Sequence, residues 1–311
     1  MEAKIENLPT GLVTGPIFFE HEGNPYERKE RLDAIGRKLE SLSLFPIAPR
    51  KATLKEVALC HTQEWIEQAQ KEILEGREMF TTGDTYLSPR TFEVALWAVG
   101  AVLEAVDAVT QKIAKNVFCL IRPPGHHAAS DKSGGYCVFN NVAIGARYAQ
   151  QHGFKKILIV DWDVHQGDGT HEIFEKDPSV FYFGIHEAGN YPCREKPAVA
   201  RVGDHIVNVA LPGEEGVREK VLQAFEEQLV PAMERFQPDF VFISAGFDSR
   251  VEDTLGGMDL TDDDFTKLTC IVKEIANKYA DGRLVSALEG GYNLEGIALA
   301  GQAHVKALTE G

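Results

Sequence analysis

Four short apolar segments of this 311-residue chain are each followed at once by a loop rich in glycine, histidine, aspartate or tyrosine. The segments are NVFCLI (116–121), KILIV (156–160), FVFISA (240–245) and LVSAL (284–288). Expected helices separate them, which is typical of a mostly parallel sheet with helices on both faces. Because such sheets bind ligands beyond the carboxyl ends of their strands, we expect the four loops to converge on one crevice.

Further segments extend this alternation along the rest of the chain. Strands are also expected at residues 180–185 and 205–211. Helices are expected at residues 26–39, 62–76, 92–112, 140–151, 217–236, 262–279 and 294–308. Because neither a linker nor an internal repeat is visible, we predict one α/β domain over residues 1–311.

The chain is acidic, with 32 lysines and arginines against 47 aspartates and glutamates and a formal charge of −15. This charge disfavours a nucleic-acid ligand, whereas a basic peptide or a polyamine is compatible with it. The apolar run at 94–103 has about half of the length that spans a bilayer, so no membrane segment is expected. Five cysteines without a CxxC pair fit neither a disulfide framework nor a cysteine-rich zinc module, and we expect a cytoplasmic protein.

The loop after residues 156–160 contains a spacing suited to metal binding. Asp163 and His165 are two residues apart, which on an extended segment places both side chains on one side. Asp248 could supply a third ligand and leave a fourth position open for water, as catalytic zinc requires. Alternatively, the aspartates cap helices or turns. Because the loops point to one crevice, we favour the metal site, with iron(II) or cobalt(II) as alternatives to zinc.

Two adjacent histidines, His126 and His127, follow the segment at 116–121 after Pro-Pro-Gly. Two carboxylate ligands would neutralise the metal, so its water would be less acidified and would need a base. One imidazole could take and return that proton while the other holds substrate or water. Asp161 and Asp168 are available as acidic partners that fix the tautomers. Adjacent histidines are often merely solvated, but their place at a strand end favours a catalytic role.

A tyrosine follows the last of the four segments. Tyr292 comes directly after Gly290 and Gly291, and two glycines allow positive φ and a close approach of the backbone. The phenol delivered into the crevice could hydrogen-bond a carbonyl oxygen as it becomes an oxyanion. For this residue taken alone, a tyrosine packed on the loop surface is the simpler interpretation.

Taken together, these motifs resemble the histone deacetylase superfamily, which includes bacterial acetylpolyamine amidohydrolases. The resemblance covers nearly the whole chain through RKERL (28–32), RPPGHHA (122–128), GYCVFNNVAIGARYA (135–149), DWDVHQGDGT (161–170), SAGFDSRVEDTLGGMDLT (244–261) and LEGGYNL (288–294). It implies the arginase–deacetylase fold, a single α/β domain around a parallel eight-stranded sheet. It also implies zinc-dependent hydrolysis of the amide of an acylated amine.

The resemblance assigns a role by position to each of the residues at the expected reaction centre. The family's zinc ligands fall on Asp163, His165 and Asp248. Its histidine pair falls on His126 and His127, with His127 as the general base and acid. The two carboxylates that support this pair and the tyrosine that polarises the carbonyl fall on Asp161, Asp168 and Tyr292.

The resemblance also implies a narrow channel that grips an acyl-lysine stem. Its walls match Gly135, Tyr136 and Tyr191, and aromatic walls suit a methylene chain with a polar end. Asp84 lies in a segment that resembles the family's substrate-orienting loop. Leu255 stands where relatives specialised for acetylpolyamines carry an acidic gatekeeper, so we expect acyl-lysine peptides to be preferred over acetylated polyamines.

Two positions depart from the family pattern and a third is a weaker match. Gln166 stands where many relatives have a second histidine, at a position that is not a ligand. Gly184 replaces the serine common in an inner monovalent-cation site, which weakens the expectation of a bound potassium ion, although Asp161 and backbone carbonyls remain. Arg31 resembles an arginine that lines an internal acetate-exit channel.

Other functions are compatible with parts of this pattern. A binuclear manganese ureohydrolase shares the fold but needs a DxD pair at Asp248, where this chain has Asp248-Ser-Arg250. A non-catalytic acyl-lysine-binding protein would lack a ligand, His127 or Tyr292, and all of these are present. An acetylpolyamine amidohydrolase remains the main alternative, and the sequence leaves the oligomeric state open.

Overall fold

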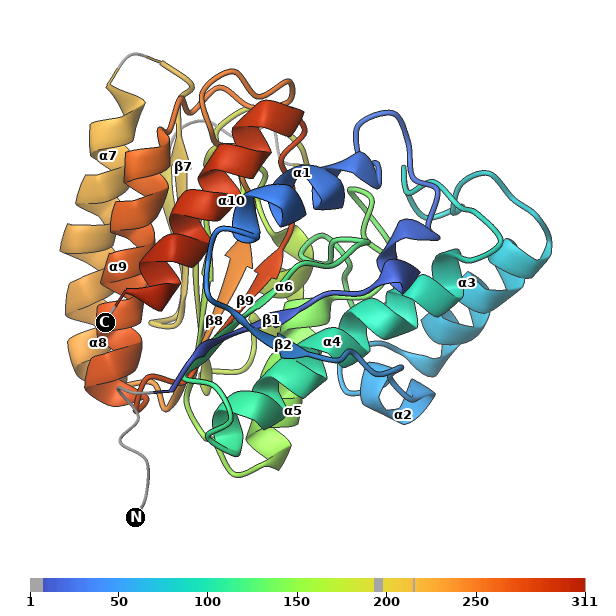
Figure 1. The fold of residues 1–311 in the computed structure, drawn as a ribbon, viewed down its shortest axis with the longest axis horizontal. Helices are drawn as coiled ribbons and strands as arrows, with labels where there is room; N and C mark the ends of the chain where they lie inside the picture. Colours follow the sequence, from blue (N-terminus) through green and yellow to red (C-terminus); the bar gives the residue numbers. More distant parts are fainter. Residues whose placement is uncertain (1–7, 193–197, 215, 311) are drawn as a thin grey trace.

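The strands assemble in an order that places the four motif-bearing strands next to one another. The computed structural model describes residues 8–192, 198–214 and 216–310, and the strands described there form one sheet (Figure 1). From edge to edge the order is β2 (Phe45–Ile47), β1 (Thr10–Val13), β3 (Asn116–Cys119), β9 (Leu284–Leu288), β8 (Phe240–Ala245), β4 (Ile157–Asp161), β5 (Val180–Glu187), β7 (Ile206–Leu211) and β6 (Ala198–Val202). All neighbours pair in parallel except β6 with β7. The motifs follow β3, β9, β8 and β4, which are consecutive in the sheet.

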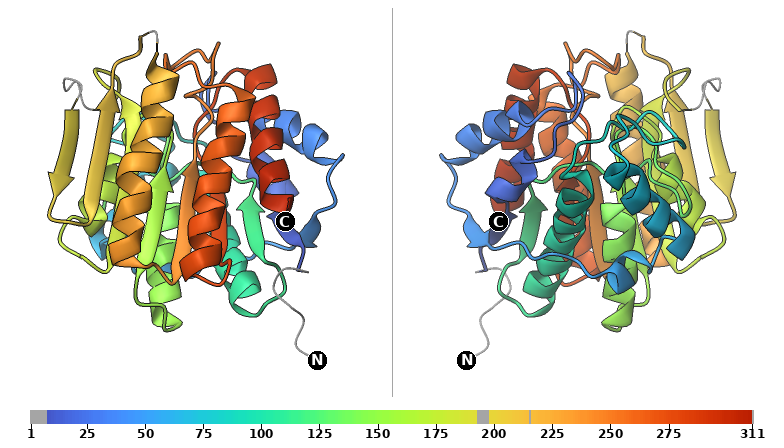
Figure 2. Two further views of the ribbon diagram at one scale, coloured as in Figure 1. Left: turned by 90° about the vertical axis from the view of Figure 1, so that its left-hand side faces the viewer. Right: turned by 90° about the vertical axis from the view of Figure 1, so that its right-hand side faces the viewer.

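Helices cover both faces of the sheet (Figure 2). One face carries α1 (Glu30–Leu39), α7 (Val217–Ala224), η3 (Phe225–Leu229), α8 (Val230–Phe236), α9 (Asp262–Tyr279) and α10 (Leu294–Thr309). The other carries η2 (Pro16–Phe19), α2 (Leu54–Val57), α3 (Gln63–Leu74), α4 (Thr91–Thr110), α5 (Asn141–Gln151) and α6 (Asp168–Phe174). The described residues thus form the single α/β domain that the alternation of segments predicts.

The core lies between the sheet and these two helical layers. Every residue of β4 and of β8 is buried, which explains why both strands are apolar runs rather than alternating ones. Helix α4 is apolar on nearly all sides because it packs against the sheet and against α3 and α5. Helix α1, at the outside, is amphipathic and buries Leu32, Ile35 and Leu39.

The sheet has nine strands in the described part of the chain, whereas eight are expected from the sequence. The eight parallel strands match the expected number, and β6 adds an antiparallel strand at one edge. Strands β1, β2 and β6 were not predicted. Strands β1 and β2 have only four and three residues, and β2 and β6 lie at the two edges, where one-sided pairing leaves a weak sequence pattern.

The single helix expected at residues 217–236 is wrong in detail. Helix α7 ends at Ala224, and the π turn η3 leads into α8 at Val230, whose N–H donates to the carbonyl of Phe225. Pro231 has no N–H to donate to the preceding turn, so the backbone widens just before it. Helix α6 was not predicted, because its seven residues are too few for a periodic pattern.

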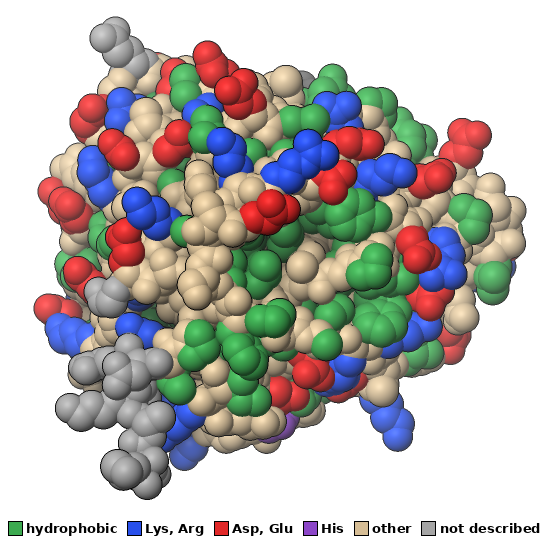
Figure 3. Space-filling view, in the orientation of Figure 1, with side chains coloured by type: hydrophobic (Ala, Val, Ile, Leu, Met, Phe, Trp, Pro, Cys, Tyr) green, Lys and Arg blue, Asp and Glu red, His purple; other side chains and the backbone are tan. Residues whose placement is uncertain are grey.

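The surface agrees with the acidic composition. On the face drawn in Figure 3, the lysine and arginine side chains of the described residues lie among aspartates and glutamates rather than in one continuous basic patch. This distribution gives no support to a nucleic-acid ligand on that face. Within the described ranges, no helix is both long enough and apolar enough to cross a membrane.

Candidate active site

The loops after β3, β4, β8 and β9 meet at the carboxyl edge of the sheet, as the sequence predicts. Backbone N–H groups of one loop donate to carboxylates of another. These contacts join Gly290 to Asp163 Oδ2 at 2.8 Å, Val164 to Asp248 Oδ1 at 3.0 Å, and Gly125 to Glu289 Oε2 at 2.6 Å. The loops therefore hold one another in place by direct hydrogen bonds.

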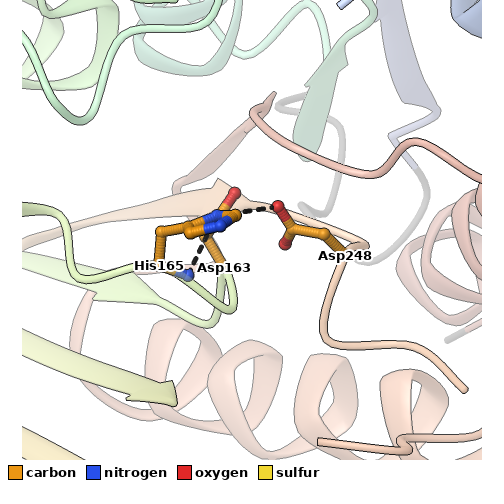
Figure 4. Close-up of side chains that lie close together, drawn as sticks. All are labelled: Asp163, His165 and Asp248. Atoms are coloured by element: carbon orange, nitrogen blue, oxygen red, sulfur yellow. Dashed lines mark hydrogen bonds and ion pairs between the residues drawn. The ribbon is translucent and has the colours of Figure 1, made fainter. Parts of the chain in front are cut away.

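Asp163, His165 and Asp248 form one buried cluster, and Figure 4 shows the imidazole of His165 beside both carboxylates. His165 Nδ1 lies 3.0 Å from Asp163 Oδ1 and 3.1 Å from Asp248 Oδ2. The donors of a tetrahedral site with bonds of about 2.0–2.1 Å lie roughly 3.3 Å apart. The two distances from His165 Nδ1 are close to this spacing, and all three ligand atoms lie within 4.8 Å of one another. Two carboxylate oxygens and an imidazole nitrogen in this arrangement fit a divalent cation.

The electrostatics of the cluster also favour a cation. Burial and the charge of Asp163 together raise the pKa of Asp248 to about 6, against the lowering effect of its contact with His165. Burial lowers the pKa of His165, but its hydrogen bonds with both carboxylates outweigh this effect and raise the pKa to about 10. Two carboxylates buried side by side thus require positive charge between them. A divalent cation supplies that charge and keeps both carboxylates ionised.

His126 and His127 each direct Nδ1 at a different carboxylate. Nδ1 of His126 lies 3.0 Å from Asp161 Oδ2, and Nδ1 of His127 lies 2.7 Å from Asp168 Oδ1. Both carboxylates are the partners that the sequence analysis names, and the structure shows which of them lies beside which ring. Because Nδ1 is engaged in each ring, Nε2 is the nitrogen left to exchange a proton or hold a ligand.

The two adjacent imidazoles have opposite pKa shifts. Burial lowers the pKa of His126, but the charges of Asp163 and Asp161 outweigh it, and the pKa lies well above its usual value. Burial also lowers the pKa of His127, the positive charge of His126 lowers it further, and the pKa stays below its usual value despite Asp168. His127 is therefore the ring that is neutral near pH 7 and able to accept a proton.

Tyr292 lies at the same edge of the sheet, behind two glycines. A Cβ on Gly290 would lie 2.1 Å from Asp248 Oδ2, so only glycine lets the loop pass this close to the cluster. Gly291 adopts a φ of 118°. Burial raises the pKa of Tyr292 well above its usual value, and the charge of Asp248 raises it further. The phenol therefore stays protonated and can donate a hydrogen bond.

A cavity of about 190 Å³ opens beside the cluster and the phenol. Its lining consists of Asp84, His127, Gly135, Tyr136, His165, Asn190, Tyr191, Leu255 and Tyr292. The structure thus brings together all five residues expected to contact substrate with three of those expected at the reaction centre. The ring of Tyr136 meets that of Tyr292 edge-on with centroids 6.0 Å apart, and the ring of Tyr191 meets that of His127 at 5.0 Å.

The walls of the cavity depend on a glycine and a rim carboxylate. Gly135 has a φ of 49°, and a Cβ there would lie 2.0 Å from Cδ2 of His127. Any side chain at this position would displace the imidazole. Asp84 is exposed at the rim, and its Oδ1 accepts the N–H of Gly135 at 2.8 Å. Asp84 is thus tied to the wall beside His127.

Arg31 and Gly184, the residues that match the family pattern less closely, lie around this centre. The Nε–H of Arg31 donates to the carbonyl of Gly291 at 2.6 Å, and its guanidinium lies 5.1 Å from the centroid of the Tyr292 ring. Arg31 is therefore packed behind the phenol, and the exit channel remains a prediction. At Gly184, a Cβ would lie 2.6 Å from the hydroxyl of Tyr182, which itself donates to Asp161 Oδ2 at 3.2 Å. A tyrosine hydroxyl thus faces Asp161 from beside the glycine that replaces serine.

The residues after Asp248 are not placed to bind a second metal. The hydroxyl of Ser249 donates to the carbonyl of Trp162 at 3.0 Å. Nε of Arg250 lies 2.8 Å from Asp262 Oδ1 in an ion pair. The arrangement gives no support to the binuclear manganese alternative.

Three residues of the site were not predicted from the sequence. Asn190 lines the cavity, the buried Glu289 accepts the N–H groups of Gly125 and His126, and Asp253 accepts N–H groups from two loops. Glu289 and Asp253 lie within motifs that carry the family resemblance, and their place in these motifs could have indicated them as site residues. The signal for Asn190 was weaker, because a single asparagine between glycine and tyrosine is typical of any turn.

Comparison with known proteins matches residues 25–308 to the histone deacetylase domain. Histone deacetylase 6 of Caenorhabditis elegans is 41% identical, over 82% of this chain and 28% of that protein. Polyamine deacetylase HDAC10 of Homo sapiens is 39% identical, over 88% of this chain and 43% of that protein. Among solved structures, the HDA15 HD domain has a TM-score of 0.89 at 33% identity and covers 97% of this chain and 90% of that one. The chain spans less than half the length of these two relatives.

Proposed function

Because the chain belongs to the histone deacetylase family, we propose that it is a zinc-dependent deacetylase that hydrolyses the amide of acetyl-lysine or a related short acyl-lysine. Its homologues support a role as a hydrolase that removes acetyl groups. We add the acyl-lysine substrate and the zinc ion to this role. One observation carries it, the cavity that joins the Asp163–His165–Asp248 cluster to His127 and Tyr292.

We assign Asp163, His165 and Asp248 as the metal ligands and zinc as the ion. A bound zinc ion would polarise the amide carbonyl and lower the pKa of a water molecule. Iron(II) or cobalt(II) also suits these ligands. A potassium ion near Asp161 stays a prediction. The Asp161 carboxylate accepts hydrogen bonds from the Tyr182 hydroxyl and the Asp163 N–H, and it contacts His126.

His127 would act as the general base and then as the general acid. Its lowered pKa leaves Nε2 free of a proton near pH 7, so that nitrogen can take the proton from the attacking water. The contact of 2.7 Å between its Nδ1 and Asp168 holds the ring and stabilises the imidazolium that follows. The same Nε2–H then protonates the departing lysine amine. His126, paired with Asp161, would hold the water or substrate as the neighbouring donor.

Tyr292 would polarise the carbonyl. A phenol that stays protonated donates to the amide oxygen, and the bond strengthens as negative charge develops on that oxygen. Tyr136 and Tyr191 would flank the lysine methylenes, with Gly135 leaving room beside His127, and Asp84 at the rim would hold the peptide backbone.

The main alternative is an acetylpolyamine amidohydrolase. The similarity to polyamine deacetylase HDAC10 is the observation that favours it. Leu255 lines the mouth of the cavity, and an apolar side chain there offers no partner for the distant ammonium of a polyamine. A peptide backbone carries no such charge. We therefore propose acyl-lysine peptides or proteins as substrates. A nucleic-acid or membrane partner is not part of the proposal, and the cytoplasmic location stays a prediction.

The deciding experiment compares kcat/KM for an acetyl-lysine peptide with that for N8-acetylspermidine in one buffer. The peptide is expected to be the better substrate. A tenfold or greater advantage for the polyamine, about 1.4 kcal/mol in transition-state binding, would replace the peptide assignment by the polyamine one. Leu255→Glu is the matched variant, and it should shift the ratio toward the polyamine while leaving metal content unchanged.

A further inference from the structure

One carboxylate in the loop between β8 and α9 binds two parts of the site at once. Oδ2 of Asp253 accepts the N–H of Tyr292 at 2.7 Å and the N–H of Asn293 at 3.0 Å. Its other oxygen, Oδ1, accepts the N–H of Leu255 at 3.0 Å. Three backbone donors from two loops thus converge on a side chain that is not among the residues lining the cavity.

The loop before Tyr292 needs such a restraint. Gly290 and Gly291 precede the tyrosine, and a glycine pair has the widest choice of backbone conformations. Asp163 binds the N–H of Gly290 and Arg31 binds the carbonyl of Gly291, and helix α10 begins at Leu294. Tyr292 and Asn293 lie between these two anchored parts. Hydrogen bonds from both backbone N–H groups to a charged acceptor fix this short segment, and with it the direction of the phenol.

The mouth of the cavity is held from two sides. Asn190 donates through Nδ2 to the carbonyl of Leu255 at 3.0 Å and to Glu187 Oε2 at 2.8 Å. This contact ties Leu255 to the end of β5 but does not touch Tyr292. The Asp253 carboxylate accepts the N–H of Leu255 and the N–H of Tyr292, so it forms a hydrogen-bonded path from the cavity wall to the tyrosine. Asn293 Nδ2 also joins the two loops, through the carbonyl of Glu252 at 2.9 Å, but this contact does not include Leu255.

We infer that Asp253 is a positioning residue that couples the fit of the substrate at Leu255 to the placement of the Tyr292 phenol. The inference rests on the proposed deacetylase function and deepens it. A stem packed against Leu255 holds the loop in the arrangement that also fixes Tyr292, and loss of the carboxylate releases both together. The role is indirect, since Asp253 acts only through these two residues.

The kinetic test is a double-mutant cycle on an acetyl-lysine peptide. Asp253→Asn keeps the size of the side chain but replaces one acceptor oxygen by an NH₂ group. Its kcat is expected to fall about tenfold or more, with a smaller change in KM. In the Tyr292→Phe background the same substitution is expected to change kcat by less than about twofold, because the phenol it positions is gone. An equal loss in both backgrounds, or an unchanged kcat in Asp253→Asn, overturns the inference.

Asp239→Asn is the matched control. The Asp239 carboxylate also accepts two backbone N–H groups, those of Lys155 at 2.8 Å and Lys156 at 3.1 Å, but it precedes β8 at the opposite end of the strand. This variant is expected to lose stability without loss of kcat. A fall in kcat as large as that of Asp253→Asn would show that lost carboxylate capping, not positioning, causes the effect.

Amide hydrogen exchange separates this inference from the proposed function. Asp253→Asn is expected to increase exchange in residues 250–257 and 289–294 together, whereas Asp239→Asn is expected to leave both segments unchanged. Absence of the joint increase overturns the coupling whatever the enzyme hydrolyses. A wild-type protein inactive on both acetyl-lysine peptide and acetylspermidine overturns the proposed function, and the exchange measurement still decides the coupling.

Discussion

At the scale of single residues, Tyr292 has the environment that most narrowly defines its chemistry. Its ring is buried, and burial keeps the phenol protonated. A neutral donor gains most from an oxygen that becomes negative, so its contribution belongs to the transition state. Tyr292→Phe is expected to lower kcat by roughly 10²- to 10³-fold, as loss of an oxyanion donor does. Steady-state kinetics on an acetyl-lysine peptide checks this.

The phenylalanine ring preserves the apolar contacts of this residue, so binding provides the control. The edge-on contacts with Tyr26 and Tyr136 involve the ring rather than the hydroxyl. Metal content and KM should therefore stay close to those of the wild type. An unchanged kcat would contradict the assignment, and a loss of metal would mean that the hydroxyl has a structural role instead.

At the scale of elements, a neutral histidine joins α10 to α9 and β9. His304 is fully buried, with Nδ1 2.7 Å from Thr269 Oγ1 and Nε2 2.8 Å from Ser286 Oγ. Burial lowers its pKa to about 3, whereas an unfolded histidine titrates near 6.5. The unfolded chain therefore binds more protons between these values. The contribution of the neutral His304 to the free energy of unfolding is therefore complete above about pH 6.5 and is lost as the pH falls toward 3.

His304→Gln removes this titration while keeping a polar side chain in place. The difference in unfolding free energy between wild type and variant is expected to shrink by about 1.4 kcal/mol when the pH falls from 7.5 to 5.5. Urea unfolding of the metal-free proteins at both pH values measures it. His152→Gln, at the exposed C-terminus of α5, tests whether any histidine replacement gives the same change. A difference independent of pH would contradict the prediction.

At the scale of the whole molecule, the candidate metal site joins loops that follow two central strands. Asp163 and His165 follow β4, Asp248 follows β8, and these strands are neighbours in the sheet. A cation bound only by the folded chain adds about 4 kcal/mol at a free concentration 1,000 times its Kd. Removal of the metal by a chelator is therefore expected to lower Tm by roughly 5 °C or more and to abolish activity.

Asp248→Ala supplies the comparison for this prediction. The variant lacks one ligand, so it should lose metal and activity together, and a chelator should not lower its Tm further. Thermal unfolding combined with elemental analysis tests both proteins. Full activity after complete chelation, or two metals per active chain, would contradict a single zinc-like site.

The sequence by itself determined the candidate site residues and the edge of the sheet at which they meet. Asp163, His165 and Asp248 were predictable because each directly follows an apolar strand, and parallel strands present their carboxyl ends together. The main elements were predictable for a similar local reason, since a helical period or a short apolar run is visible within a single segment. The family resemblance then indicated Gly135, Tyr136 and Leu255, which line the cavity.

Only the tertiary structure decided what depends on contacts between distant segments. Strands β1 and β2 are too short to have a clear period, and they form because β1 pairs with β3 and β2 then pairs with β1. The opposite pKa shifts of His126 and His127 also depend on folding. The carboxylates of Asp163 and Asp161 raise the pKa of His126 against the effect of burial, whereas burial and the charge of His126 lower the pKa of His127. Asp253 bonds to Tyr292 across 39 residues of sequence, a hydrogen bond that no local pattern encodes because its partner is a backbone N–H.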